Sequence, residues 1–473
     1  MVFSSVSFLV FFLPALLITY YVIPARLRGL RNAVLLLFSL GFYAFGGVKY
    51  LSLLLLSILI NYTCGILASA PHSPAVRKAG VVLAVTLGLG LLGWFKYAGF
   101  FAQTACSLGM PIPVPQIVLP VGISFFTFQG LSYVIDVARG SAACQKNPLY
   151  VALYIALFPQ LVAGPIVRYT TVEREISERS ESMEEFSSGL VRFLFGFAKK
   201  MLLANAMGEA ADAVFALSPQ LLSASTAWVG AIAYTFQIYF DFSAYSDMAI
   251  GLGRMFGFHF LENFNYPYIA ASVTEFWRRW HISLSTWFRD YLYIPLGGNR
   301  RGTAAQLRNL VIVWLLTGLW HGASWNFIAW GAWFCLLLIG EKFVWHSLLE
   351  RVPSVLRHLY TMLAVIISWV FFRAPTLGAA AAFLRVMFLG AAGSPPSGIS
   401  TYFILQYLPE FFLCLVACLP IKSFLRAELE RRESVLSEIL LVLAPKLIAL
   451  ALFALSYMKL VSGGFNPFIY YQF

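Results

Sequence analysis

The sequence predicts an all-α protein that crosses a membrane many times. Of its 473 residues, 60% are hydrophobic and only 11% are charged, and the mean hydropathy is +0.78. Soluble domains carry about a quarter charged residues, so this chain has too little polar surface to fold in water. Apolar runs that approach the ~20 residues needed to cross a bilayer recur throughout the chain. These observations together favour transmembrane helices joined by polar loops.

The expected spans follow the apolar runs in chain order. They are residues 6–20, 32–45, 51–67, 80–94, 150–163, 227–238, 310–319, 327–339, 359–372, 403–419 and 439–455. They number about eleven, give or take two, because several runs are short or contain Gly or Pro. No charge precedes the first run and no small-residue cleavage site closes it, so it is interpreted as a span. We expect residues 1–473 to form one transmembrane domain.

Basic residues set the expected orientation. They follow the first and third runs, as Arg26, Arg28, Arg31, Arg77 and Lys78, whereas residues 103–116 carry no charge. The positive-inside tendency then places the N-terminus outside and these two loops in the cytoplasm. The net charge of +12 comes mostly from residues that punctuate apolar runs. It therefore indicates anchoring to the inner leaflet of a lipid bilayer, and no nucleic-acid partner is expected.

The middle of the chain does not resemble lipid-facing helices. Charge, aromatic residues and glycine mix between residues 240 and 308, and Asp241 and Asp247 border or enter the membrane. Carboxylates at that depth are costly and usually face a cavity or a basic partner. Residues 120–130 and 158–168 are broken by Gly and Pro, which is tolerated where backbone is buried in protein or lines water. We expect a helical shell around a wet centre.

Two histidines lie in Trp-rich segments, WRRWHISLSTWFRD and LTGLWHGASWNFIAWG. If each segment is a continuous helix, the residues that share a face with His281 are Trp277 and Ser285, and the face of His321 continues to Trp325. Arginines flank His281 and place it near the cytoplasmic surface. His321 follows about ten residues of apolar sequence and is expected to lie deeper.

Depth gives these histidines a chemical role. Burial favours the neutral imidazole, which can take a proton from a hydroxyl group. An activated hydroxyl can attack a thioester carbonyl without a metal ion, and N–H groups of Trp325 or Asn326 could stabilise the oxyanion. The plainer alternatives are a core histidine bonded to a backbone carbonyl for His321 and an interfacial histidine for His281. The six cysteines show no metal-ligand spacing, so no metal or permanently bound cofactor is expected.

Six segments carry a resemblance to a known family. They are LPVGISFFTFQGLSYVIDV (119–137), FPQLVAGPIVR (158–168), QIYFDFSAYSDMAIGLGRMFGF (237–258), NFNYPY (263–268), FWRRWHISLSTWFRDYLYIPLGGNRRG (276–302) and LWHGASWNFIAWG (319–331). In this order they resemble the membrane-bound O-acyltransferase superfamily, and in particular its bacterial branch that acetylates exported polysaccharide. Residues 119–331 hold all these motifs, and the helices in residues 391–473 match none.

The resemblance implies a fold, a location and partners. The fold is a ring of transmembrane helices with a thin centre and a funnel on each side, in the bacterial inner membrane. A cytoplasmic thioester donor, acetyl-CoA or an acyl-carrier protein, meets the centre, and the acetyl group passes outward to a polysaccharide. Extracytoplasmic acetyltransferase partners complete the transfer. The deep histidine of the family is catalytic, which maps to His321, and His281 is its second characteristic polar residue.

The hypothesis for the site assigns a role to each group. His321 is the general base and His281 orients the donor or relays protons. Arg278, Arg279, Arg300 and Arg301 attract the phosphates of the donor, or they anchor a helix end at lipid headgroups. Asp241, Asp247 and Asp290 pair with basic groups. The full set of donor-binding or supporting residues is Arg278, Arg279, Trp277, Ser285, Asp290, Asn299, Arg300, Trp325 and Asn326.

Three other functions are open at this point. A close relative of the resembled branch transfers D-alanine to teichoic acid, but YIPLGGNRRG favours the acetylating branch. A polysaccharide or lipid transporter explains the broken spans and buried carboxylates, although it gives no reason for two Trp-flanked histidines. A haem protein with His281 and His321 as axial ligands is the third possibility.

Overall fold

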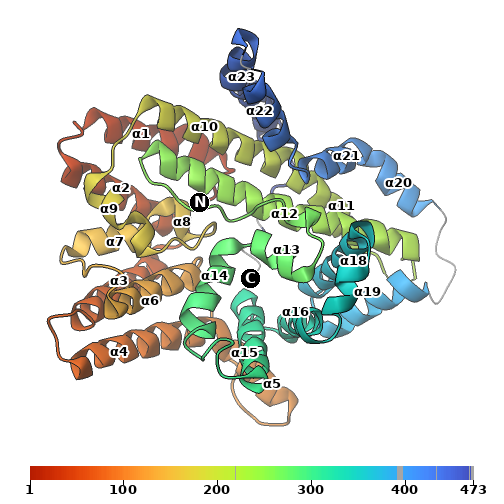
Figure 1. Cartoon of the computed structure of the whole chain (residues 1–473), viewed down its shortest axis with the longest axis horizontal. Helices are drawn as coiled ribbons and strands as arrows, with labels where there is room; N and C mark the ends of the chain where they lie inside the picture. The colour runs from red at the N-terminus through yellow and green to blue at the C-terminus, as the bar shows by residue number, and fades with distance from the viewer. Residues whose placement is uncertain (219, 391–397, 433, 468, 470–473) are drawn as a thin grey trace. The chain divides into compact units, whose positions relative to one another are not determined.

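The computed structural model describes residues 1–218, 220–390, 398–432, 434–467 and 469. Its described residues form helices and no strands, which confirms the all-α prediction (Figure 1). Contacts between Cα atoms divide the chain into two compact units, Met1–Phe193 with Ser246–Leu261 (unit 1) and Leu194–Tyr245 with Glu262–Phe473 (unit 2). Parts of the predicted C-terminal region, residues 391–397, 433, 468 and 470–473, lie outside the described residues.

Unit 1 contains the first nine α-helices. They are α1 (Leu13–Val22), α2 (Arg28–Ala44), α3 (Val48–Leu67), α4 (Pro74–Leu92), α5 (Ala98–Ser107), α6 (Ile123–Arg139), α7 (Pro148–Ala156), α8 (Phe158–Leu161) and α9 (Tyr169–Glu178), with the π-helical turns η1 (Ser7–Phe12) and η2 (Gly93–Tyr97). Two further helices, α10 (Met183–Ala198) and α12 (Ala224–Met255), contribute residues to both units.

Unit 2 contains the remaining helices. They are α11 (Asn205–Phe215), α13 (Val273–Arg279), α14 (Ile282–Phe288), α15 (Thr303–His321), α16 (Trp325–Phe343), α17 (His346–Arg351), α18 (Ser354–Arg373), α19 (Leu377–Leu389), α20 (Ile399–Gln406), α21 (Leu408–Ala417), α22 (Ile421–Arg431) and α23 (Val435–Val461), with the short turns η3 (Lys199–Ala204), η4 (Pro267–Ile269) and η5 (Arg289–Tyr293).

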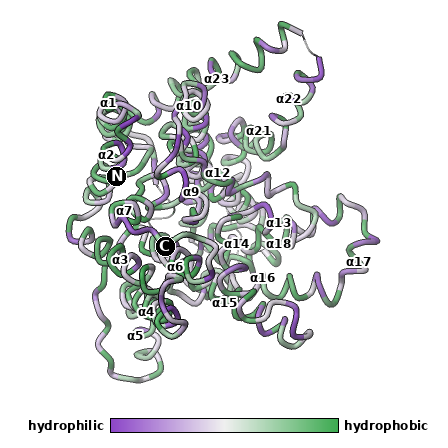
Figure 2. Tube along the Cα trace, turned by 60° about the vertical axis from the view of Figure 1, so that its left-hand side comes forward, coloured by the Kyte–Doolittle hydropathy of each residue, from purple (hydrophilic) through white to green (hydrophobic). Residues whose placement is uncertain are grey.

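Several helices meet the requirements for crossing a membrane. Among the described residues, four candidates are long and apolar enough, and they are Val48–Leu67, Pro74–Ser107, Ser354–Arg373 and Val435–Val461; the bent pair α20 and α21 makes up to five. Only 11% of the most apolar part of α23 is buried, so most of its side chains are available to lipid. Figure 2 shows α4 and α23 as mainly hydrophobic and α22 as mixed. The count of about eleven spans remains a prediction.

The core of unit 1 is an aromatic cluster between helices that pack side by side. Helices α3, α4 and α6 contact one another, and α2 lies against α7. Phe3, Phe8, Phe42 and Phe158 are almost completely buried. Their ring centroids are 5.0 Å apart for Phe3 and Phe8 and 5.6 Å apart for Phe42 and Phe158, distances at which aromatic pairs attract each other.

A buried ion cluster ties the segment between α9 and α10 to the start of α2. Glu181 is bonded to Arg28 and lies 3.0 Å from Arg31 and 3.6 Å from Arg179. Burial raises the pKa of Glu181, but the hydrogen bond from Arg28, a hydrogen bond from Tyr20 and the charges of Arg28 and Arg179 outweigh it, and the net pKa is lowered. Arg28 and Arg31 therefore form ion pairs inside unit 1, in addition to any role at the membrane surface.

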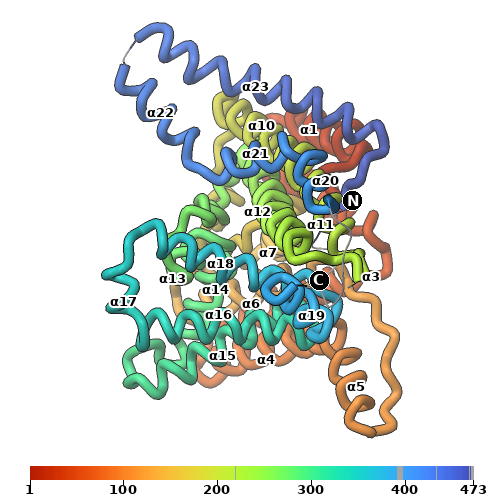
Figure 3. The backbone as a smooth tube through the Cα atoms, turned by 90° about the vertical axis from the view of Figure 1, so that its right-hand side faces the viewer, coloured from red at the N-terminus to blue at the C-terminus, as the bar shows by residue number. Residues whose placement is uncertain are grey.

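In unit 2, α15 and α16 form a tight helical hairpin. Figure 3 shows them side by side, with α18 next to α16. The short helix α13 packs on both α16 and α18. This arrangement brings the segment before His281 against the hairpin that carries His321. Helices α22 and α23 form a second hairpin near the C-terminus.

His259, in the loop after α12, joins two helices of unit 1. Its Nδ1 lies 2.7 Å from a carboxylate oxygen of Glu175, and its Nε2 lies 2.7 Å from one of Glu185. Both ring nitrogens can donate only if the imidazole is protonated. Burial lowers the pKa of His259, but the hydrogen bonds and charges of Glu175 and Glu185 outweigh it, and the net pKa is raised.

We predict that replacement of His259 by Gln lowers stability in a pH-dependent way. A raised pKa in the folded state adds stability that is complete below the unfolded value of 6.5 and is lost as the pH rises through the folded value. The loss of Tm should therefore be larger at pH 6 than at pH 9. His72→Gln, at an exposed histidine of the same unit, is the control. An equal loss of Tm at both pH values would contradict the assignment.

Candidate active site

His321 is the last residue of α15 and is held by the turn into α16. Gly322 ends α15 in an extended conformation, and α16 begins at Trp325. The two helices pack closely because of two glycines. A Cβ atom at Gly318 would lie 2.3 Å from the carbonyl oxygen of Phe327, and one at Gly331 would lie 2.3 Å from that of Trp314. Only glycine permits this approach, so the glycines of the motif fix the position of His321.

Aromatic rings surround the imidazole of His321. Its centroid is 4.9 Å from that of Trp330, 5.1 Å from Trp320 and 5.3 Å from Phe372. The residue is 5% exposed. Such an environment excludes bulk water and favours an uncharged imidazole. The depth of His321 in the membrane remains a prediction.

His281 lies next to His321. The ring centroids of the two histidines are 6.5 Å apart, and Phe242 and Trp320 contact the ring of His281 at 4.6 and 5.9 Å. His281 is completely buried. The structure therefore brings together the two histidines that the sequence analysis selects, although we expected them at different depths.

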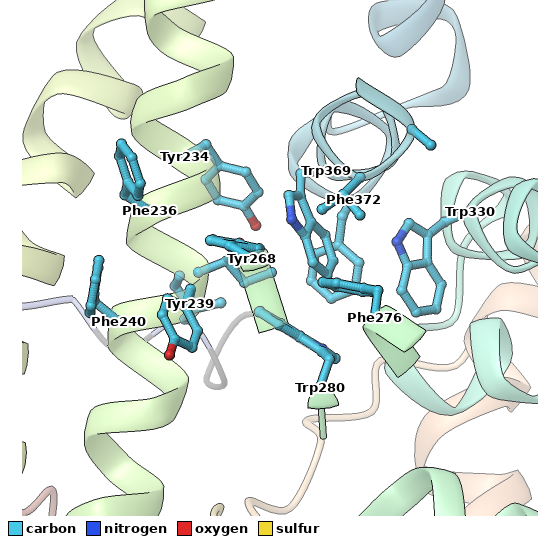
Figure 4. Close-up of a cluster of buried hydrophobic side chains, with 14 of the residues drawn as sticks. Tyr234, Phe236, Tyr239, Phe240, Tyr268, Phe276, Trp280, Trp330, Trp369 and Phe372 are labelled. Carbon is cyan, nitrogen blue, oxygen red and sulfur yellow. The ribbon is translucent and has the colours of Figure 1, made fainter. Parts of the chain in front are cut away.

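A wall of stacked aromatic side chains lies beside the histidines. Figure 4 shows Tyr268, Phe276 and Trp280 between α12 and the rings of Trp369 and Trp330. Phe276 and Trp280 are stacked with centroids 5.5 Å apart, and Trp280 lies 4.9 Å from Trp369. These large rings are buried against one another. They make the surroundings of the histidines closely packed and apolar.

The continuous helix expected around His281 is wrong. Helix α13 ends at Arg279, His281 has φ 43° and ψ 53°, and α14 begins at Ile282. This left-handed conformation is uncommon for residues other than glycine and persists only where the surroundings impose it. Trp277 and Ser285 therefore lie on different helices and do not share a helical face with His281.

The helical face expected for His321 also ends early, because α15 stops at that residue. Trp325 is 54% exposed, whereas Asn326 is buried. The side-chain amide of Asn326 donates to the carbonyl oxygens of Ala374, at 2.8 Å, and Phe371, at 3.3 Å. Its N–H groups thus already serve to hold the start of α16 to the end of α18.

The other predicted site residues occupy two kinds of position. Trp277 is buried against Trp314, with centroids 4.7 Å apart, and supports the hairpin. The exposed or half-buried polar residues are Arg278, Arg279, Ser285, Asp290, Asn299, Arg300 and Arg301. Of these, Arg279 pairs with Glu275 at 2.8 Å, and Asp290 pairs with Arg289 at 2.7 Å.

The predicted pairing of the carboxylates is confirmed. Lys200 lies 2.7 Å from Asp241, and each side chain is 3% exposed. The second carboxylate oxygen of Asp241 accepts a hydrogen bond from the backbone N–H of Ile469 at 3.0 Å. In unit 1, Arg192 lies 2.9 Å from Asp247. Asp241 and Asp247 are thus each matched by a cation, which offsets the cost of removing their charge from water.

Two residues of the site received no role from the sequence, although Asn263 begins the NFNYPY motif. Asn263 accepts hydrogen bonds from the segment that contains His281. Glu341, from α16, is buried and accepts hydrogen bonds from the backbone N–H groups of Val273, at 2.6 Å, and Thr274, at 2.9 Å. It therefore fastens the first turn of α13 to the hairpin of His321. For Glu341, the sequence signal is a carboxylate near the end of an apolar run.

Comparison with known proteins identifies the class. The model of the MBOAT, membrane-bound O-acyltransferase, family matches residues 139–378, a range that contains both histidines. A probable alginate O-acetylase of Azotobacter vinelandii is 40% identical over 506 aligned positions that cover 100% of both chains. The chain belongs to the membrane-bound O-acyltransferase family. It is a multi-pass membrane protein and an acyltransferase.

The names of other relatives specify a different acceptor or a different acyl group. A peptidoglycan O-acetyltransferase of Helicobacter pylori is 35% identical over 420 residues, 82% of this chain and 80% of the relative. A teichoic acid D-alanyltransferase of Bacillus subtilis is 27% identical over 276 residues, 55% of this chain and 68% of the relative. Membership of this family favours acyl transfer over the transporter and haem interpretations.

We predict that Gly331→Ala disrupts the hairpin that carries His321. The added methyl group meets a backbone oxygen, which cannot move without shifting α15. Tm should fall by several degrees and activity should fall with it. Gly90→Ala, in α4, is the matched control because a Cβ atom there meets nothing within 4 Å. Unfolding followed in detergent checks this, and an unchanged Tm for Gly331→Ala would contradict the packing argument.

Proposed function

We propose that this enzyme moves an acetyl group from a cytoplasmic thioester donor to a hydroxyl of an exported polysaccharide or of a periplasmic partner protein. The observation that carries the proposal is the pair of buried imidazoles, His281 and His321, with ring centroids 6.5 Å apart. The acetyl group is supported by the full-length similarity to alginate O-acetylases, which exceeds the similarity to D-alanyltransferases. D-alanyl transfer is the alternative.

The chemistry needs a base and no metal ion. His321 takes the proton of the acceptor hydroxyl as its oxygen attacks the thioester carbonyl. The new C–O bond forms, the C–S bond breaks, and the proton passes to the departing thiolate. His281 either orients the donor or relays the proton. The apolar rings around His321 keep it neutral and able to accept a proton.

The exposed arginines suit the donor. Arg300 and Arg301 precede α15 in the loop that follows η5, and both are exposed. Guanidinium groups bind phosphates through paired hydrogen bonds, and acetyl-CoA and carrier-bound thioesters both contain phosphate. Because the proposed donor is cytoplasmic, this role requires the loop to lie on the cytoplasmic side of a bacterial inner membrane. Partners outside the cytoplasm then receive the acetyl group.

We predict that His321→Ala lowers kcat/KM for acetyl transfer by roughly 10²–10⁴-fold, the usual contribution of a general base. Purified protein in vesicles, supplied with labelled acetyl-CoA and candidate acceptors, provides the measurement. His346→Ala is the control, since His346 is exposed and pairs only loosely with Glu350, at 3.5 Å. Equal label transfer by the His321 variant and the parent protein would refute the catalytic assignment.

We predict that the double variant Arg300→Ala/Arg301→Ala raises KM for the thioester donor about tenfold while kcat changes little. Each lost phosphate contact removes binding that the ground state and transition state share. The effect should shrink at high salt, because these arginines are exposed to screening. Arg426→Ala/Arg431→Ala, on exposed positions of α22, is the matched control. An unchanged KM would assign the two arginines to membrane anchoring.

A further inference from the structure

The backbone around His281 is held by a segment 18 residues earlier. The N–H of Asn265 donates to the carbonyl of Arg279 at 2.9 Å, and the N–H of Ile282 donates to the carbonyl of Asn263 at 3.0 Å. Between these two bonds, His281 adopts its left-handed conformation. The segment 263–265 therefore imposes the conformation that breaks the helix at the histidine.

The side chain of Asn263 then fixes the proton on the imidazole. Its Oδ1 lies 3.2 Å from the backbone nitrogen of Ser283. A backbone N–H can only donate, so the amide atom that faces it must be the oxygen and not the nitrogen. The same Oδ1 lies 3.2 Å from Nδ1 of His281. The hydroxyl of Ser283 lies 3.5 Å from the same Nδ1, but it donates its proton to Oδ1 of Asn263 at the shorter distance of 2.9 Å. Both oxygens therefore present lone pairs to Nδ1, and Nδ1 carries the proton.

We propose that Asn263 is a positioning residue that holds His281 in the Nδ1–H tautomer, so that Nε2 presents a lone pair to the reacting groups. Nε2 is buried and has no hydrogen-bond partner among the described residues. A neutral imidazole with its proton on Nδ1 can accept a proton at Nε2 but cannot donate a hydrogen bond there.

This inference rests on the proposed function and decides between the two roles open for His281. To orient the donor, His281 would have to donate a hydrogen bond to the carbonyl oxygen of the thioester, and an unprotonated Nε2 cannot donate one. A proton relay needs a lone pair, which Nε2 has. During transfer, the hydroxyl proton is released as the C–O bond forms and is taken up by sulfur as the C–S bond breaks. His321 takes this proton as general base, and Nε2 of His281 then accepts it from His321 and delivers it to the departing sulfur.

The tautomer can be measured without turnover. Full-length protein labelled with ¹⁵N-histidine is purified in detergent, and the signals of His281 are assigned from their loss in His281→Gln. We expect a protonated Nδ1 and an unprotonated Nε2 at neutral pH. Asn263→Ala should abolish this preference and give a mixture of tautomers. A protonated Nε2 in the parent protein would overturn the inference.

Kinetics separate positioning from simple folding. Asn263→Ala should lower kcat by roughly tenfold to a hundredfold, as loss of an orienting partner commonly does, with KM for acetyl-CoA nearly unchanged. Asn263→Asp keeps the acceptor oxygen and should retain most of the activity. Its carboxylate stabilises the imidazolium, so the acidic limb of the pH–rate profile should move to higher pH. Asn265→Ala, in the same segment, is the matched control and should behave as the parent.

Each outcome has one meaning. Full activity of Asn263→Ala, or an Asn263→Asp profile that does not move, overturns the role of Asn263. If Asn263→Ala fails to fold, the pH–rate profile of Asn263→Asp and the tautomer of His281 in the parent protein still test the role of Asn263. An active His321→Ala refutes the proposed function and leaves the tautomer of His281 standing, whereas a protonated Nε2 refutes this inference and leaves the role of His321 standing.

Discussion

The burial of two imidazoles side by side is the constraint on which the rest of the site depends. A buried polar ring must be bonded or must serve a function, since an unmet hydrogen bond costs about 1–3 kcal/mol. His281 meets half of this need through Asn263. Everything around the pair keeps the rings in place. The glycines let α15 approach α16, and Glu341 fastens α13 to that hairpin. The rings of Trp320 and Trp330 pack against the imidazole of His321. A general base works only when its position and protonation are both set.

Polar groups elsewhere follow the same rule of pairing. The Lys200–Asp241 pair is as deeply buried as the histidines and also receives the backbone N–H of Ile469. Glu181 is neutralised by a group of arginines. Pairs of this kind contribute little net stability, because removing two charges from water offsets their attraction. They do make one arrangement strongly preferred, because any rearrangement would leave a buried charge alone. In unit 2 the bond from Ile469 to Asp241 holds the C-terminal segment against α12. Asp241 is followed by Phe242, whose ring contacts that of His281.

The sequence predicts the fold class correctly and selects two histidines that the structure brings together, but it predicts the local geometry around them poorly. Composition and hydropathy suffice for an all-α membrane protein, and the Trp-rich motifs single out His281 and His321. The break at His281 escapes prediction because the local pattern is compatible with a helix, and the cause is Asn263, which is distant in the chain. Trp325 and Asn326 suit an oxyanion by residue type, yet Trp325 is exposed and the Asn326 amide is already bonded. Glu341 acts only through a tertiary contact, which no spacing in the sequence reveals.

The most direct test of the central claim is the location of a bound donor. A structure of the protein with a non-hydrolysable acetyl-thioester analogue, determined by cryo-electron microscopy in lipid, supplies it. Our account predicts that the acyl carbonyl lies beside the rings of His281 and His321, within reach of a proton acceptor. Density that places the acyl group away from both imidazoles, while the analogue still inhibits the enzyme, would contradict the account.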